Sequence, residues 1–117
     1  MPRFVLLEHT GHPDDPSGRH YDLLLEAAEA CRTWRLADIP VVGGPPVTAT
    51  PLPAHRLVWL DRLEGNVSGG RGFARRVHAG SYRCLTESTA SPVVVELQSE
   101  TLSGRLSINE DSVSLHA

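Results

Sequence analysis

The feature that most constrains the fold of this chain is a succession of short strand-like segments separated by turns rich in glycine and proline. Apolar and polar residues alternate in several segments, as side chains do across the two faces of a β-strand. Regularly spaced short strands are typical of small barrels and sandwiches, and closure into a barrel removes exposed sheet edges. The sequence therefore predicts an all-β fold, a small closed or nearly closed β-barrel of about eight short strands with long irregular loops. The segments are residues 3–8, 20–26, 31–36, 55–60, 73–78, 81–85, 92–97, 102–108 and 113–115.

Two stretches between these segments are expected to be irregular. Residues 37–54 combine adjacent glycines with several prolines, which predicts a long connection over the surface. Residues 66–72 form a glycine-rich loop without the Gly-Lys-Ser/Thr ending of a P-loop, so we expect a plain hairpin turn with glycines at positive φ. An anion-binding turn with Arg71 at its tip is the alternative.

The composition is that of a soluble globular domain. The 117 residues are 40% hydrophobic with a mean hydropathy of -0.18, which predicts a single domain over residues 1–117. The first residues lack the apolar stretch of a secretory signal, and no segment has the roughly 20 apolar residues of a membrane helix, so a cytoplasmic protein is expected. Cys31 and Cys84 have no disulfide-framework or metal-binding spacing, and we expect both to be reduced, half-buried strand residues.

The charges argue against a protein that coats duplex nucleic acid and are compatible with a site that binds one or two phosphates. A net charge of -3 is not the basic footprint of a protein that coats duplex nucleic acid. The chain has 11 arginines and no lysine. The planar guanidinium group of arginine offers a fork of donors that fits one or two phosphates.

The segment 20–26 separates its residues into two faces. His20, Asp22, Leu24 and Glu26 share one face of a strand, which we interpret as a chemical face, whereas the intervening residues face the core. An imidazole and a carboxylate two residues apart on a strand can converge on one metal ion.

A further histidine is needed for a three-donor metal site. His9 follows the apolar segment near the N-terminus and is the first candidate. His12 with Asp14, in the loop before His20, is the alternative source of the first ligand.

Several short motifs follow one another along the chain: Glu8-His9, His20-Tyr21-Asp22 with Leu25-Glu26, Trp34, His55 before Trp59-Leu60-Asp61, the loop at 69–72, Gly80-Ser81-Tyr82 and residues 102–106. Their order resembles that of the 3′-phosphoesterase domain of bacterial DNA ligase D. That family is a small β-barrel that uses a divalent metal, typically manganese, to remove a 3′-terminal ribonucleoside and then the 3′-phosphate from a primer strand.

The resemblance assigns roles to particular residues. It implies that His9, His20 and Asp22 bind manganese or another divalent metal such as zinc, and that His55 contacts the scissile phosphate. Arg71 is a further candidate catalytic residue, and Arg19, Arg56 and Glu26 are candidate substrate-binding residues. The implied partner is a nucleic-acid 3′ end, DNA or an RNA-tipped primer, together with a separate DNA ligase; no membrane partner is expected, and the chain is expected to be a monomer.

The chain departs from the family at three positions that bear on phosphate binding. The arginine of the family's HYD-x-Arg-Leu-Glu strand is Leu24, its later tyrosine is Trp59, and the lysine after its tryptophan segment has no match at residues 34–38. These changes leave a metal site in place and remove part of the expected phosphate contact.

Three functions are consistent with these residues. The first is a metal-dependent phosphoesterase acting on 3′ ends, and the second is a non-catalytic module of the same fold that binds a nucleic-acid end or a repair partner. The third is an iron oxygenase, because two histidines and one carboxylate also describe the iron site of that class. Metal identity separates the third from the first, and turnover of a 3′-phosphate separates the first from the second.

Overall fold

The computed structural model describes residues 2–13, 18–67, 70, 72–87 and 92–117. These residues contain strands and one short 3₁₀ helix but no α-helix, so the predicted all-β class is confirmed. The elements are β1 (Arg3–Thr10), β2 (Arg19–Glu26), β3 (Cys31–Leu36), β4 (Val47–His55), η1 (Leu57–Leu60), β5 (Glu64–Asn66), β6 (Phe73–Cys84), β7 (Val93–Gln98), β8 (Gly104–Ile108) and β9 (Ser112–His116).

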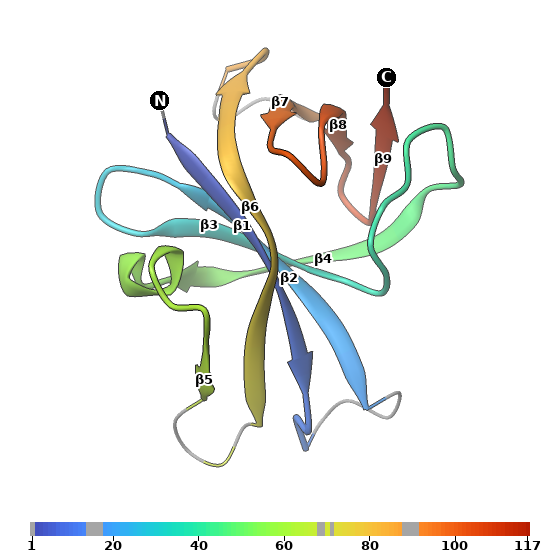
Figure 1. Ribbon diagram of the computed structural model, residues 1–117. Coiled ribbons are helices and arrows are strands. Elements are labelled where there is room, and N and C mark those ends of the chain that lie inside the picture. Colours follow the sequence, from blue (N-terminus) through green and yellow to red (C-terminus); the bar gives the residue numbers. More distant parts are fainter. Residues whose placement is uncertain (1, 14–17, 68–69, 71, 88–91) are drawn as a thin grey trace.

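Eight of the strands form a nearly closed ring (Figure 1). Their order is β1-β2-β3-β4-β9-β8-β7-β6, and the long strand β6 pairs back with β1. The short strand β5 lies outside the ring, paired with the first residues of β6. The narrowest junction is that of β4 with β9, where only Val47 with Val113 and Thr48 with Ser112 are paired. The predicted small, nearly closed barrel is therefore confirmed.

Three expectations about individual segments are wrong. Residues 47–54, expected to be irregular, belong to strand β4, because a strand accepts proline along an edge that forms no ladder. Residues 57–60 form η1 instead of continuing a strand. The segments 73–78 and 81–85 belong to one strand, β6, since Gly80 there is not a turn residue: a Cβ at this position would collide with the Gln98 carbonyl, so the glycine permits close packing of two strands.

The glycine-rich loop joins β5 and β6 as a hairpin, as expected. Asn66 pairs with Phe73, and the Val67 amide donates to the Gly72 carbonyl over 2.8 Å. Gly70 and Gly72 both have positive φ. Arg71, at the expected tip, lies outside the described residues.

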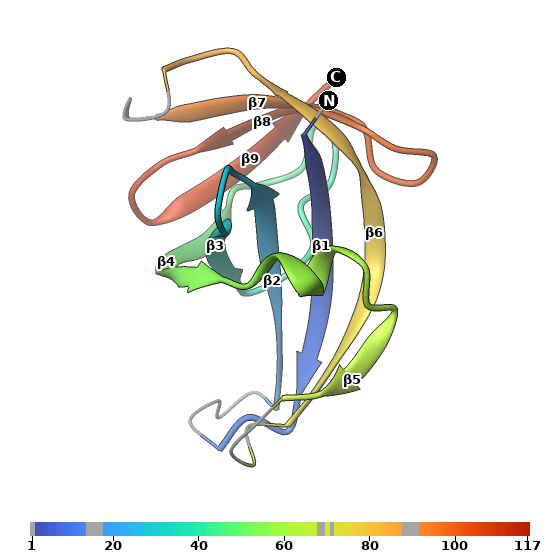
Figure 2. The same ribbon diagram turned by 90° about the vertical axis from the view of Figure 1, so that its left-hand side faces the viewer.

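Two apolar clusters lie on opposite sides of the wall formed by β1, β2 and β3. The interior cluster fills the ring and includes Phe4, Leu23 and Leu106. The outer cluster lies on the other face and includes Leu24 and Leu60, together with Val5, Leu7, Cys31 and Ala74. Figure 2 shows η1 crossing β1 and β2 on this outer face. Both faces of β2 are consequently buried, whereas one apolar face and one chemical face were expected.

The cysteines are free thiols with different environments. Cys31 is fully buried in the outer cluster and Cys84 is exposed, so neither is half-buried as expected. Within the described part of the chain, no helix has the length and apolar character needed to cross a membrane.

Candidate metal centre

The pairing of β1 with β2 brings the first two predicted metal ligands together. His9 lies directly opposite His20 in the antiparallel register, and Leu7 lies opposite Asp22. Residues that are opposite in an antiparallel pair share a face, so His9, His20 and Asp22 all project from the outer side of the wall. The two imidazole ring centroids are 4.6 Å apart. One ligand atom from each of the three residues lies within 4.8 Å of the others.

The carboxylate of Asp22 lies between the two imidazoles. Its Oδ2 is 3.5 Å from Nδ1 of His9, and its Oδ1 is 3.6 Å from Nε2 of His20. Two donors each about 2.1 Å from one ion at a tetrahedral angle are about 3.4 Å apart, which is close to these separations. The spacing of the three side chains therefore fits a shared cation.

The burial of Asp22 supports the same interpretation. Its side chain is 5% exposed, and Oδ1 accepts no hydrogen bond from the described residues. A buried carboxylate oxygen without a hydrogen bond is costly, because it loses hydration and gains no donor in return. A cation held by the two imidazoles and this carboxylate would supply the missing interaction.

His55, at the end of β4, reaches the cluster from a third strand. Its Nε2 is 3.9 Å from Oδ2 of Asp22, and its Nδ1 is 3.1 Å from the Pro53 carbonyl oxygen. Since a carbonyl oxygen only accepts, Nδ1 is the protonated nitrogen in this contact and Nε2 faces Asp22. The structure thus brings His55 beside the cluster of His9, His20 and Asp22.

His12 borders the cluster without belonging to it. Its ring centroid is 5.5 Å from that of His9 and 6.0 Å from that of His20. Among the described residues, the group with metal-binding spacing contains His9 and not His12. Asp14, the proposed companion of His12, lies outside the described residues.

A cavity of about 780 Å³ opens over the cluster. Its floor is the outer face of β1, β2 and β3, and its other walls come from the end of β4 and from the segment that carries η1 and β5. Among the described residues, the lining contains three arginines and one carboxylate, that of Asp22. The arginines are Arg35, Arg56 and Arg62, and the guanidinium of Arg62 is 5.1 Å from the ring centroid of Trp59.

Two of the predicted substrate-binding residues are not at this cavity. Arg19 is on the opposite face of β2 from His20, with Nη1 3.8 Å from Oε2 of Glu8. Glu26, at the far end of β2, accepts a 2.7 Å hydrogen bond from the Arg3 amide and lies 3.5 Å from the Arg3 guanidinium. Arg56, the third predicted substrate-binding residue, is in the cavity lining.

The sequence interpretation missed Arg35 and Arg62. The alternation in residues 31–36 puts Arg35 on the face opposite Trp34, but only the register shows which neighbours it has: Arg35 is directly opposite Asp22. Arg62 follows η1, just beyond the segment 55–60 that was expected to be a strand, and no pattern in the sequence indicates its place.

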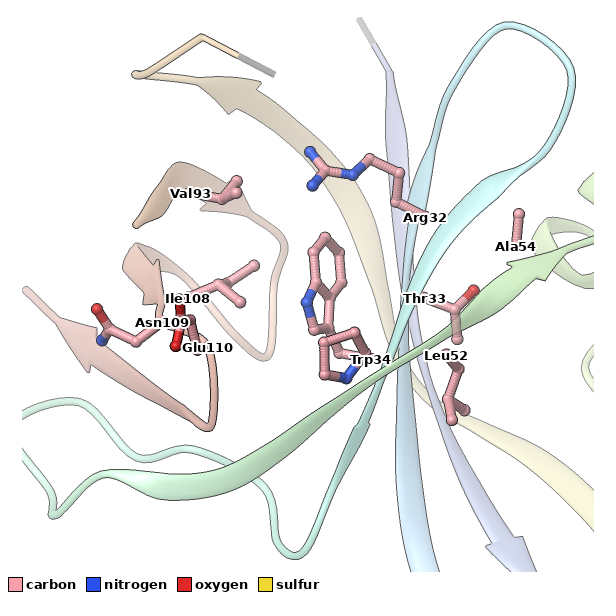
Figure 3. Close-up of a pocket in the computed structure, with 10 residues that line it drawn as sticks. Arg32, Thr33, Trp34, Leu52, Ala54, Val93, Ile108, Asn109 and Glu110 are labelled. Atoms are coloured by element: carbon pink, nitrogen blue, oxygen red, sulfur yellow. The ribbon is translucent and has the colours of Figure 1, made fainter. Parts of the chain in front are cut away.

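A second hollow, of about 350 Å³, lies on the other side of β3 (Figure 3). Figure 3 shows Trp34 between β3 and the side chains of Val93 and Ile108. The guanidinium of Arg32 is 4.9 Å from the Trp34 ring centroid. The tryptophan of the resemblance therefore belongs to the interior core, away from the histidine cluster.

Comparison with known proteins adds no family assignment. No protein-family model matches the sequence, and no curated protein matches it. The structural observations that bear on function are the cluster and the cavity.

Proposed function

We propose that this chain is a divalent-metal-dependent phosphoesterase that acts on 3′ ends of nucleic acid, removing a 3′-ribonucleoside or a 3′-phosphate in DNA repair. The observation that carries the proposal is the buried group of His9, His20 and Asp22 opening into an arginine-lined cavity. A cation site beside clustered guanidinium groups suits a ligand with an anionic reacting centre.

The donor set suits manganese or zinc. Two imidazoles and one carboxylate combine the ligand types preferred by zinc and by manganese, and three protein donors leave further positions for water and a phosphate oxygen. The bound ion would supply Lewis acidity at the phosphate and would increase the acidity of a coordinated water.

His55 would act on the leaving group. Its Nδ1–H bond to the Pro53 carbonyl holds the ring with Nε2 turned towards the cluster. In the proposed hydrolysis of a 3′-phosphate, water attacks phosphorus, the bond from phosphorus to the 3′ oxygen breaks, and the leaving oxygen takes a proton from Nε2 of the imidazolium form. For a 3′-ribonucleoside, the bond that breaks is the one from phosphorus to that nucleoside's 5′ oxygen, which takes the proton in the same way. The water releases its proton to solvent, and His55 is reprotonated before the next turnover.

The choice of a nucleic-acid 3′ end rests on the order of motifs described above. A phosphate at such an end is a dianion on a flexible strand, which the cavity can receive without a duplex-coating surface. A separate DNA ligase is the partner implied for the resulting 3′-hydroxyl, and manganese or zinc is the implied cofactor.

Turnover of a defined primer tests the proposal. A primer-template with a 3′-phosphate or a single 3′-ribonucleotide is incubated with protein and manganese, and the products are resolved by gel electrophoresis. We expect conversion to a 3′-hydroxyl end by the wild type and by His116→Ala, an exposed histidine on β9. His20→Ala should be inactive, and absence of conversion by the wild type with either substrate would refute the proposal.

The second candidate is a non-catalytic module of the same fold that binds a nucleic-acid end or a repair partner. The observation that favours it is Leu24, which replaces the family's arginine and is completely buried in the outer cluster. Binding of the same primer without conversion, in the presence of manganese, is the result that this candidate predicts.

A further inference from the structure

Arg35 is the cavity residue whose surroundings point to a missing partner. It projects from β3 on the same face as Asp22, its direct neighbour in the register, and it lines the cavity over the histidine cluster. Its Nε is out of contact with solvent and has no hydrogen-bond acceptor. Within the described residues the Arg35 guanidinium forms no ion pair.

The adjacent carboxylate does not satisfy this guanidinium. Asp22 directs its two oxygens towards His9 and His20, at 3.5 and 3.6 Å, and forms no ion pair with Arg35. A partly buried guanidinium that lacks a counter-charge is unfavourable, because its hydration is reduced and its donors are unused. The two other arginines of the lining are exposed, so Arg35 is the one placed deep in the cavity.

We infer that Arg35 is the anion-binding residue of this site and holds the phosphate of the ligand next to the His9, His20 and Asp22 cluster. A guanidinium can bind phosphate through two N–H groups at once, and within the described residues the guanidinium N–H groups of Arg35 have no acceptor. The ligand's phosphate bridges Arg35 and the cluster, and the exposed Arg56 and Arg62 face the part of the ligand that extends to the cavity mouth.

In this assignment the phosphate-binding arginine is on β3, whereas the resemblance implies one on the neighbouring strand β2. The resemblance implies an arginine at position 24 of β2, where this chain has a buried leucine. Arg35 supplies a guanidinium from β3 to the same outer face of the wall. The inference rests on the proposed function for the ligand's identity as a phosphate ester, whereas the contact with an anion depends on Arg35 alone.

Phosphate binding by the metal-free protein tests the inference. Protein freed of metal with a chelator is titrated with inorganic phosphate by calorimetry at pH 7.5 and constant ionic strength. We expect saturable binding by the wild type and a loss of affinity of about tenfold or more in Arg35→Gln, since a charge-assisted bidentate contact is removed. Arg105→Gln, which removes an exposed arginine on β8, is the matched control and should bind as the wild type does.

Two further measurements keep the test decisive. Arg35→Lys retains the charge without the fork and should lie between the wild type and Arg35→Gln. Manganese affinity should be unchanged in Arg35→Gln, which shows that the variant is folded and that its cluster is intact. Equal phosphate affinity in the wild type and Arg35→Gln, or no saturable phosphate binding by the wild type, would overturn the inference.

The primer assay separates this inference from the proposed function. If phosphate binding depends on Arg35 but the wild type does not convert a 3′-phosphate primer, the anion site stands and the enzymatic proposal fails. If conversion occurs and Arg35→Gln changes neither phosphate affinity nor kcat/KM, the enzymatic proposal stands and the role of Arg35 fails.

Discussion

The interior and the outer face of the β1–β3 wall are both buried, but they are buried in different ways. The interior is closed by the ring of strands, and its cluster consists of apolar side chains such as Leu23, with Tyr21 and Tyr82 as its only hydroxyl-bearing members among the described residues. The outer face is covered by the short segment that includes η1, and its smaller apolar cluster adjoins His9, His20 and Asp22. The buried polar cluster thus lies on the outer face, which is covered by the short η1 segment and adjoins an open cavity.

Adjacent residues of one strand therefore stabilise different parts of the molecule. Leu23 and Leu24 are neighbours in sequence, yet one stabilises the ring and the other supports the segment above the cluster. The side that carries the cluster can tolerate polar groups because the cavity gives access to solvent and ligands, whereas the described members of the interior cluster are apolar or aromatic.

The largest expected effect comes from removing a cluster residue on the outer face. His20→Ala and Asp22→Asn should each weaken manganese binding by more than about 100-fold, because a direct ligand is lost. The fold should persist, since the interior cluster is unaltered. Calorimetry with manganese and thermal unfolding by circular dichroism measure the two properties, and unchanged manganese affinity in both variants would eliminate the metal site.

A charge placed in the outer cluster should destabilise the protein strongly. Leu24→Arg puts an arginine at a position with 0% exposure among apolar side chains, and an unpaired buried charge costs about 3–5 kcal/mol. We expect a lower free energy of unfolding and no gain in turnover of a 3′-phosphate primer. Leu63→Arg, at an exposed leucine of the covering segment, is the control and should change stability little. Normal stability of Leu24→Arg with faster turnover would mean that the position belongs to the phosphate site.

Truncating adjacent leucines compares the two faces directly. Leu23→Ala and Leu24→Ala each remove a fully buried side chain, with an expected cost of about 2–5 kcal/mol. The cost should be greater for Leu23, because the segment over Leu24 can partly collapse into the space and the ring cannot. Urea unfolding measures the loss of stability in both variants. A greater loss for Leu24→Ala would contradict the expectation that the segment over Leu24 can collapse into the space.

The smallest effect concerns a histidine outside the cluster. Burial lowers the pKa of His78 below its ordinary value of 6.5, and its Nδ1 is 2.7 Å from the Thr101 hydroxyl. Because the unfolded chain binds this proton more readily, the contribution of His78 to stability is complete above pH 6.5 and is lost as the pH falls through its folded-state pKa. His78→Gln should therefore lose less stability than the wild type between pH 7.5 and 5, as measured by urea unfolding. Equal losses would assign the pH dependence to other groups.

The sequence predicted the fold class and the grouping of His9, His20 and Asp22, because both depend on local alternation. The i and i+2 spacing of His20 and Asp22 puts them on one face of any strand, and the nearby apolar segment carries His9 to the same edge. The prediction was wrong at β4 and β6, because proline and glycine usually indicate loops and turns. In the structure these residues lie within strands. Local composition cannot distinguish a glycine that turns the chain from one that admits a neighbouring strand.

The candidate phosphate contact was not predictable from the sequence. Arg19 was favoured because it is adjacent to His20, yet adjacent residues of a strand point to opposite faces. Arg35 is thirteen positions after Asp22 and becomes its neighbour only through the β2–β3 register. Register depends on which strands pair and on the turn that joins them, and the alternation within one segment reveals neither.

The short junction of β4 with β9 has a consequence for self-association. The Ala49 amide of β4 donates to the Asp111 carbonyl on the β9 side over 2.9 Å. Amides two and four residues later would point to that same side, beyond the last residue pair, but these positions are Pro51 and Pro53 and have no N–H. An incoming strand would find two donors missing along this edge, so the gap in the ring is a poor template for strand addition and for aggregation.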